Sequence, residues 1–198
     1  MATVALDLLG GDGAPGVVAD AIARLCGPES SQPGSPDPAD LIVVGPAAVA
    51  RELLVERGVD PDRVRIVDAG RGASMAGNPL SMLRAHDDVT VTVAVGLVNA
   101  GLADAWVSVG HTGAAVAAAV LGLGRLSGMS RPALAVVLPS LAGPVVLVDA
   151  GAAPDATPDV LRQFALAGWA YSRSLGVASP KVGLISIGSE DGKGDRLR

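Results

Sequence analysis

The stretch Val107-Ser108-Val109-Gly110-His111-Thr112-Gly113-Ala114 decides the fold, because a Gly-His-Thr-Gly turn joins a short apolar run to an alanine-rich helical pattern over residues 114–123. A strand that opens directly into a helix is the repeating unit of an α/β fold. It aims backbone N–H groups and the positive end of the helix dipole at one spot. Gly110, Thr112 and Gly113 therefore predict either an anion site, with phosphate as the favoured ligand, or an ordinary loop with a helix cap.

The same alternation of apolar runs and helical patterns extends along the chain in both directions. It predicts strands at residues 4–8, 41–44, 64–67, 104–109, 133–138, 145–148 and 181–187, and helices at residues 15–25, 47–57 and 158–175. For the last helix, Thr157 is the expected cap, Pro158 the first residue and Asp159 a partner of the dipole. Parallel strands buried on both faces suit this pattern, so the fold class is α/β, with a layered, mostly parallel sheet and flanking helices.

One segment allows two interpretations. Residues 90–95 alternate like a half-buried strand, whereas Val91, Val95, Val98 and Leu102 recur at helical spacing. The surrounding rhythm of strands and helices favours the helix. The chain is predicted to form a single α/β domain over residues 1–198, with a flexible Pro/Ser/Gly-rich internal loop at about residues 27–40.

Composition limits the class of protein. The chain has 198 residues, 49% hydrophobic and 2% aromatic, and a net charge of −5, which argues against general nucleic-acid binding. The single cysteine, Cys26, excludes an internal disulfide and a cysteine-based metal site. The uncharged window 105–124 is long enough for a membrane span, but its Gly-His-Thr-Gly turn predicts a strand and a short helix instead. No secretory signal pattern opens the chain, so a cytoplasmic location is expected.

Three glycine-bearing loops, at residues 10–16, 110–113 and 188–194, follow predicted strands. In α/β sheets, ligands bind outside the carboxyl ends of the strands. The first loop contains Gly11-x-Gly13-x-x-Gly16, formally a dinucleotide fingerprint. The acidic residue that should end the second strand is missing, because Val44 is followed by Gly45, so nucleotide binding is only a distant alternative.

Five segments resemble, in the right order, the PlsX-type phosphate acyltransferases: residues 4–12, 101–114, 131–134, 146–152 and 187–194. The resemblance covers nearly all of this chain and about the first three-fifths of the family's usual extent. It implies an isopropylmalate-dehydrogenase-like or phosphotransacetylase-like fold, here incomplete. It also implies an enzyme that transfers a fatty acyl group from acyl carrier protein to inorganic phosphate for phospholipid synthesis. Such enzymes are homodimers without an organic cofactor, and are soluble or loosely attached to the membrane.

The residues and the resemblance together give a candidate site without a metal. His111 and Lys193 are the candidate catalytic residues. The candidate residues for binding phosphate or the acyl group are Asp7, Gly11, Asp12, Gly110, Thr112, Gly113, Asp149 and Glu190. Backbone amides and Lys193 suit a multiply charged nucleophile that attacks a thioester carbonyl. For the three aspartates, a loop or cap hydrogen bond is the competing role.

His111 stands where the family pattern has Asn, and Ala153 where it usually has Asn. His111 is either a general base, a cation for phosphate, or a hydrogen-bonding replacement for Asn. The basic segment that precedes the 101–114 motif in the family is reduced here to residues 84–90. An inactive, truncated relative that binds an anion or a protein partner is therefore the alternative to the transferase.

Overall fold

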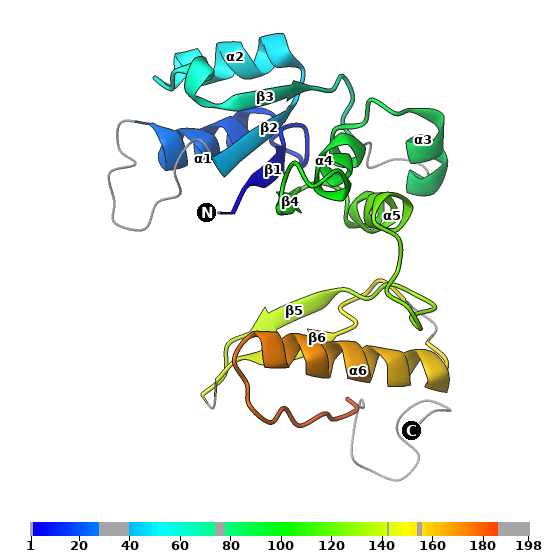
Figure 1. The fold of residues 1–198 in the computed structure, drawn as a ribbon. Coiled ribbons are helices and arrows are strands. Elements are labelled where there is room, and N and C mark those ends of the chain that lie inside the picture. The colour runs from blue at the N-terminus through cyan, green and yellow to red at the C-terminus, as the bar shows by residue number, and fades with distance from the viewer. Residues whose placement is uncertain (1, 28–39, 74–77, 142, 154–155, 186–198) are drawn as a thin grey trace. The chain divides into compact units, whose positions relative to one another are not determined.

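The computed structural model describes residues 2–27, 40–73, 78–141, 143–153 and 156–185. They belong to two compact units, Met1–Gly124 and Arg125–Arg198, which are described here one at a time (Figure 1). A single domain over residues 1–198 stays a prediction. The predicted flexible loop at about residues 27–40 falls almost wholly outside the described residues.

The first unit is built on a four-stranded parallel sheet. Its strands are β1 (Val4–Asp7), β2 (Leu41–Gly45), β3 (Arg65–Asp68) and β4 (Ala105–Val107), in the spatial order β3-β2-β1-β4. Residue 4 of β1 lies opposite Leu41 of β2 on one side and Ala105 of β4 on the other. The predicted α/β class with a parallel sheet is confirmed. The strand order reverses between β1 and β4, because β2 and β3 lie on one side of β1 and β4 lies on the other.

Helices cover both faces of this sheet (Figure 1). The helices are α1 (Gly16–Cys26), α2 (Ala47–Glu56), α3 (Pro79–Ala85), α4 (Thr90–Asn99) and α5 (Thr112–Gly122), with a short 3-10 turn at Pro61–Arg63. One face carries α1 and α2, and the other carries α4. The helices α3 and α5 pack against α4 and each other, further from the sheet. Helix α3 is not among the helices expected from the sequence.

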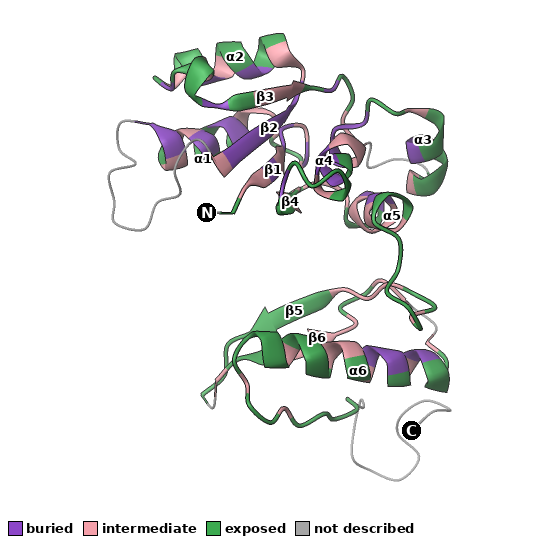
Figure 2. Cartoon of the chain, viewed as in Figure 1, coloured by how far each residue is buried: buried purple, intermediate pink, exposed green. Residues whose placement is uncertain are grey.

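The core follows the two-residue period of the strands. In β2, Leu41 and Val43 face α1 and α2, whereas Ile42 and Val44 face α4, and all four are buried (Figure 2). A strand buried on both faces must be apolar at every position, which is why the run 41–44 has no polar residue.

The segment that fitted both strand and helix is helix α4. Its buried residues Val91, Ala94, Val95 and Leu97 lie on the side that meets the sheet and the neighbouring helices. Valine favours strands locally, but burial of this face contributes more than the propensity difference of a few tenths of a kcal/mol per residue. The prediction of a helix is confirmed.

The second unit pairs β5 (Ala135–Leu138) with β6 (Val145–Val148) and adds α6 (Pro158–Ser174). The two strands are antiparallel, with Ala135 opposite Val148. Helix α6 begins as predicted: the Thr157 hydroxyl accepts a hydrogen bond from the Val160 amide, and Pro158 and Asp159 occupy the first turn.

The strand predicted at residues 181–187 is wrong over its described part. Residues 181–185 pair with none of the described strands, and Val182, Leu184 and Ile185 are more than half exposed. An apolar run forms a strand only where a neighbouring strand takes up its N–H and C=O groups, and no described neighbour does so here. Within the described ranges, no helix is both long and apolar enough to cross a bilayer.

We expect the core of the first unit to be sensitive at Leu54 and tolerant at its neighbour Val55. Leu54 is 1% exposed and packs in the α1–α2 layer, whereas Val55 is 62% exposed. Leu54→Ala should lower the free energy of unfolding by about 2–5 kcal/mol, because it leaves a cavity. Val55→Ala should change it by less than about 0.5 kcal/mol.

Denaturant unfolding followed by tryptophan fluorescence measures this difference. The chain has two tryptophans, Trp106 in the first unit and Trp169 in the second, so a Trp169→Phe background makes the signal specific to the first unit. Equal losses for Leu54→Ala and Val55→Ala would contradict the packing described here.

Candidate functional site

The candidate site of the first unit lies at the carboxyl ends of β1 and β4. Strand β1 continues into the loop before α1, on one face of the sheet, and β4 continues into the loop before α5, on the other face. In open α/β sheets, ligands bind near such a reversal of strand order. Both loops are glycine-rich: Gly10 and Gly11 follow β1, and Gly110 and Gly113 follow β4.

A hydrogen bond joins the two strand ends beneath these loops. The Ser108 hydroxyl donates to Asp7 Oδ2 at 2.7 Å, although the two residues are 101 positions apart in sequence. The other carboxylate oxygen of Asp7, which is 1% exposed, accepts from the Leu9 amide at 3.1 Å. Asp7 therefore orients its own loop and the Ser108 hydroxyl, which agrees with the loop role considered for it from the sequence.

Glycine is required where the loops meet. A Cβ atom on Gly10 would lie 2.6 Å from Ser108 Oγ and 2.8 Å from Asp7 Oδ2. A Cβ atom on Gly110 would lie 3.1 Å from the Cα atom of Gly10. Gly11 has a φ of 103°, in the region that favours glycine. The backbones of the two loops can approach each other this closely only because residues 10 and 110 have no side chain.

His111 is the N-cap of α5. Its Nδ1 atom accepts hydrogen bonds from the amides of Gly113, at 2.9 Å, and Ala114, at 3.4 Å. An Asn at this position would offer an equivalent acceptor, which supports the interpretation of His111 as a hydrogen-bonding replacement. A catalytic role for His111 stays a prediction. Sequence reasoning expected the Gly113 amide to face an anion, but the imidazole occupies it.

Several amides at this edge remain available. The Gly110 amide donates to Ser108 Oγ at 3.2 Å, whereas those of Gly11, His111 and Thr112 have no hydrogen-bond partner within the described part of the chain. We call these three amides, together with Ser108 Oγ, the amide cradle. Unpaired N–H groups beside a helix N-terminus favour an anion electrostatically.

Sequence reasoning missed Ser108 and Gly10. Both stood within quoted motifs, but their importance comes from a contact between the first and fourth strands. That contact depends on strand order, which no local pattern reveals. A hydroxyl two residues before a glycine turn, at the end of a strand, was the available signal.

The other predicted site residues are dispersed. Asp12 is exposed in the loop after β1. Asp149 belongs to the second unit, where its carboxylate accepts from the amides of Leu134, Ala152 and Ala153 at 3.1, 2.9 and 2.6 Å. This carboxylate shapes the loop after β6. Lys193 and Glu190 lie outside the described residues. Among the residues described, no cluster of His, Cys, Asp or Glu could hold a metal ion.

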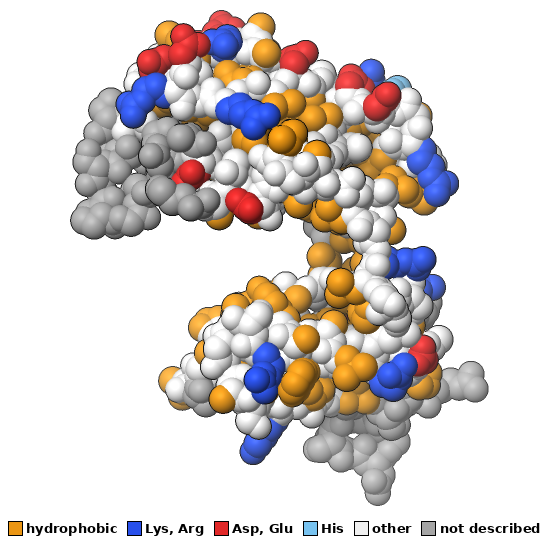
Figure 3. Space-filling model, viewed as in Figure 1, with side chains coloured by type: hydrophobic (Ala, Val, Ile, Leu, Met, Phe, Trp, Pro, Cys, Tyr) orange, Lys and Arg blue, Asp and Glu red, His pale blue; other side chains and the backbone are white. Residues whose placement is uncertain are grey.

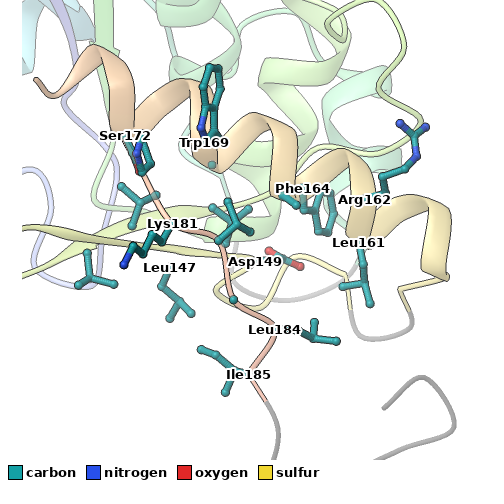
Figure 4. A pocket seen from close by; sticks show the side chains of 18 of the residues that line it. Leu147, Asp149, Leu161, Arg162, Phe164, Trp169, Ser172, Lys181, Leu184 and Ile185 are labelled. Atoms are coloured by element: carbon teal, nitrogen blue, oxygen red, sulfur yellow. The ribbon is translucent and has the colours of Figure 1, made fainter. Parts of the chain in front are cut away.

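The second unit has an apolar pocket of its own, with a volume of about 1020 Å³. Its walls come from β6, one side of α6 and residues 180–185, with Phe164, Leu147 and Leu184 among the side chains that line it (Figure 4). Apolar side chains also reach much of the surface of this unit in the view of Figure 3. All four residues of β5 are exposed, including Val136 and Val137.

Comparison with known proteins places the chain in a family. A family model described as "Fatty acid synthesis protein" matches residues 2–198. A phosphate acyltransferase of Desulfitobacterium hafniense (strain Y51) is 41% identical over 198 residues, which are 100% of this chain and 56% of that protein. The chain belongs to the fatty acid synthesis protein family.

Two further relatives show a similar identity and a similar partial coverage. A phosphate acyltransferase of Thermus thermophilus is 39% identical over 98% of this chain and 56% of its own length. A phosphate acyltransferase of Thermosynechococcus vestitus is 42% identical over 99% of this chain and 55% of its own length. The chain thus spans about half the length of the curated relatives that it matches.

The cap at His111 predicts a difference between two substitutions. His111→Ala removes the acceptor for two amides and should destabilise the first unit by about 1 kcal/mol. His111→Asn keeps an acceptor and should cost only a few tenths of a kcal/mol. Denaturant unfolding in the Trp169→Phe background measures both changes. Equal losses of stability in His111→Ala and His111→Asn would rule out the cap as the source of either change.

Proposed function

We propose that this chain is the phosphate-binding portion of a phosphate acyltransferase, which moves a fatty acyl group from acyl carrier protein to inorganic phosphate. The amide cradle at the reversal of strand order supports this proposal most directly. Its three amides have no hydrogen-bond partner among the described residues, and the loops that carry them meet at glycines. The relatives carry the name phosphate acyltransferase, which describes acyl transfer to phosphate.

The reaction assigns clear roles to such a site. A phosphate oxygen attacks the thioester carbonyl, a C–O bond forms, and the C–S bond breaks to release the carrier-protein thiol. Amides that hold the phosphate in place convert an encounter into an intramolecular attack and contribute to lowering the barrier. Lys193 remains the proposed source of positive charge, and the enzyme is proposed to act in the cytoplasm as a homodimer, soluble or loosely attached to the membrane.

A pair of glycine variants tests the phosphate site. Gly10→Ala should displace Ser108 and Asp7 and so distort the amide cradle, whereas Gly96→Ala, on an exposed turn of α4 with nothing within 4 Å of the new Cβ, should be tolerated. Phosphate at about 100 times its dissociation constant should stabilise the parent chain and Gly96→Ala by about 2.7 kcal/mol. The same concentration should stabilise Gly10→Ala much less.

Turnover is measured in parallel with the same three proteins. Phosphate-dependent release of carrier-protein thiol from acyl-acyl-carrier protein should occur with the parent chain and Gly96→Ala, and fall in Gly10→Ala. Stabilisation by phosphate without any thiol release by the folded parent chain would instead identify a non-catalytic binding relative.

The pocket of the second unit is the proposed place for the acyl chain. Pockets of this size that bind small molecules are mostly apolar with a few polar groups, and Asp149, Ser172 and Lys181 are the polar side chains here beside Arg162. Within one unit, β6 and α6 provide an apolar floor and wall against which methylene groups can be removed from water.

Two alanines of α6 form a matched test of this pocket. Ala165 lines the pocket, whereas Ala170 is exposed and does not line it. Ala165→Trp should fill the space and weaken binding of a fluorescent long-chain fatty acid about tenfold or more, and Ala170→Trp should not. Equal affinities in the two variants would place the acyl chain elsewhere.

A further inference from the structure

One side of helix α6 carries a line of exposed residues. Arg162, Leu166, Trp169 and Arg173 are all exposed, and their spacing of four, three and four residues places them along one side of the helix. Figure 4 shows the side chains of Arg162 and Trp169 leaving α6 on the same side. The Arg173 guanidinium lies over the Trp169 ring, 5.4 Å from its centroid. We call these four residues the α6 stripe.

The residue types on this helix are those of a protein interface. Three of the four aromatic residues of the chain, Phe164, Trp169 and Tyr171, belong to α6. Phe164 is buried, whereas Trp169 is 43% and Tyr171 41% exposed. Trp, Tyr and Arg are the residue types that contribute most binding energy in protein–protein interfaces. A chain with so few aromatic residues exposes two of them on one helix, beside two arginines, which indicates a surface that a partner covers.

The charge of the second unit indicates what kind of partner fits. From residue 125 onward, the described ranges hold five Lys or Arg residues and two Asp residues, although the whole chain has a net charge of −5. Asp149 accepts from three backbone amides, and Asp159 pairs with Arg162 at 2.9 Å. No described carboxylate pairs with Arg173. In the view of Figure 3, basic side chains flank apolar ones on this unit. Charge complementarity therefore favours an acidic partner.

The α6 stripe also borders the apolar pocket of the same unit. Arg162 and Trp169 belong to the stripe and line the pocket as well. The proposed function places the acyl chain in this pocket. A chain that is still linked to its carrier protein can enter only if the carrier lies against the surface beside the opening. The stripe is such a surface.

We propose that the α6 stripe docks the acyl carrier protein, through a helix of that protein that is acidic on the facing side. This inference rests on the proposed function and adds the surface that receives the acyl donor. Leu166 and Trp169 form the apolar centre of the contact, and Arg162 and Arg173 pair with carboxylates at its two ends. The eleven residues from Arg162 to Arg173 rise about 16 Å along α6, so a facing helix of about three turns covers the stripe.

Fluorescence anisotropy tests the proposal, with the labelled acyl carrier protein of Desulfitobacterium hafniense as the probe and the full 198-residue chain as the titrant. Arg173→Glu should raise the dissociation constant about tenfold or more, because it sets like charges against each other. Arg173→Lys keeps the positive charge and should stay within about threefold of the parent chain. Arg24→Glu makes the same change of charge on an exposed arginine of the first unit and should bind like the parent chain.

Salt and a second variant separate the charged part of the contact from the apolar part. Raising NaCl from about 50 mM to about 500 mM should weaken carrier binding by the parent chain more than by Arg173→Glu, since the variant has already lost the attraction. Leu166→Ala should weaken binding about fivefold and keep the salt dependence of the parent chain. Far-UV circular dichroism verifies that each variant is folded; if Arg173→Glu does not fold, Leu166→Ala decides.

Two other occupants of the stripe give different results. Co-sedimentation with phosphatidylglycerol vesicles that Arg173→Glu abolishes, at unchanged affinity for the carrier protein, would assign the stripe to a membrane surface and overturn the proposal. Light scattering that shows a dimer in the parent chain and a monomer in Leu166→Ala, again at unchanged carrier affinity, would assign it to a second copy of this chain. That result would overturn the proposal as well.

The outcomes also distinguish this inference from the function on which it rests. Thiol release by the parent chain, with equal carrier affinity in Arg173→Glu, overturns the role of the stripe and leaves the transferase standing. Carrier binding that depends on the stripe, without thiol release by the folded parent chain, supports the docking surface and overturns the transferase. A folded parent chain that neither binds the carrier protein nor releases its thiol overturns both.

Discussion

The hydrogen bond between Asp7 and Ser108 is the contact on which the candidate site depends. It joins the ends of β1 and β4 at the place where the strand order of the sheet reverses. A buried carboxylate without a donor would be costly, and Ser108 and the Leu9 amide supply two. The hydroxyl can reach Asp7 only if residues 10 and 110 are glycines. The contact of Ser108 with Asp7 therefore depends at once on the glycines of the loops, on the strand order and on the buried carboxylate.

The elements of the first unit could be predicted because their apolar patterns agree with their burial. Residues 41–44 are apolar throughout and are buried on both faces, and the helical spacing of Val91 and Val95 matches the buried side of α4. The glycine loops could be placed at strand ends for the same reason. The contact of Ser108 with Asp7 could not be predicted, since it requires knowing that β4 lies beside β1, and strand order is a property of the whole sheet.

The second unit shows the opposite case, because an apolar pattern there predicted a strand that does not form. Residues 181–185 are apolar enough for a strand, yet they pair with none of the described strands and are exposed. Pairing partners come from elsewhere in the chain, so composition cannot guarantee them. His111 illustrates a similar limit at the site. Its type suggested acid–base chemistry, but the geometry of α5 assigns Nδ1 to two backbone amides, which is a structural use of the same lone pair.

The electrostatics of the first unit favour recognition by dipoles over recognition by charge. The chain has a net charge of −5, and the Ser108 hydroxyl of the cradle donates to the carboxylate of Asp7. A site of this kind gains little from long-range attraction, and its backbone N–H groups act only over the short distance of a hydrogen bond. The Ser108 hydroxyl directs the positive end of its own dipole toward the Asp7 carboxylate. Backbone N–H groups in fixed positions, rather than charged side chains, are therefore what the described part of this edge offers to an anion.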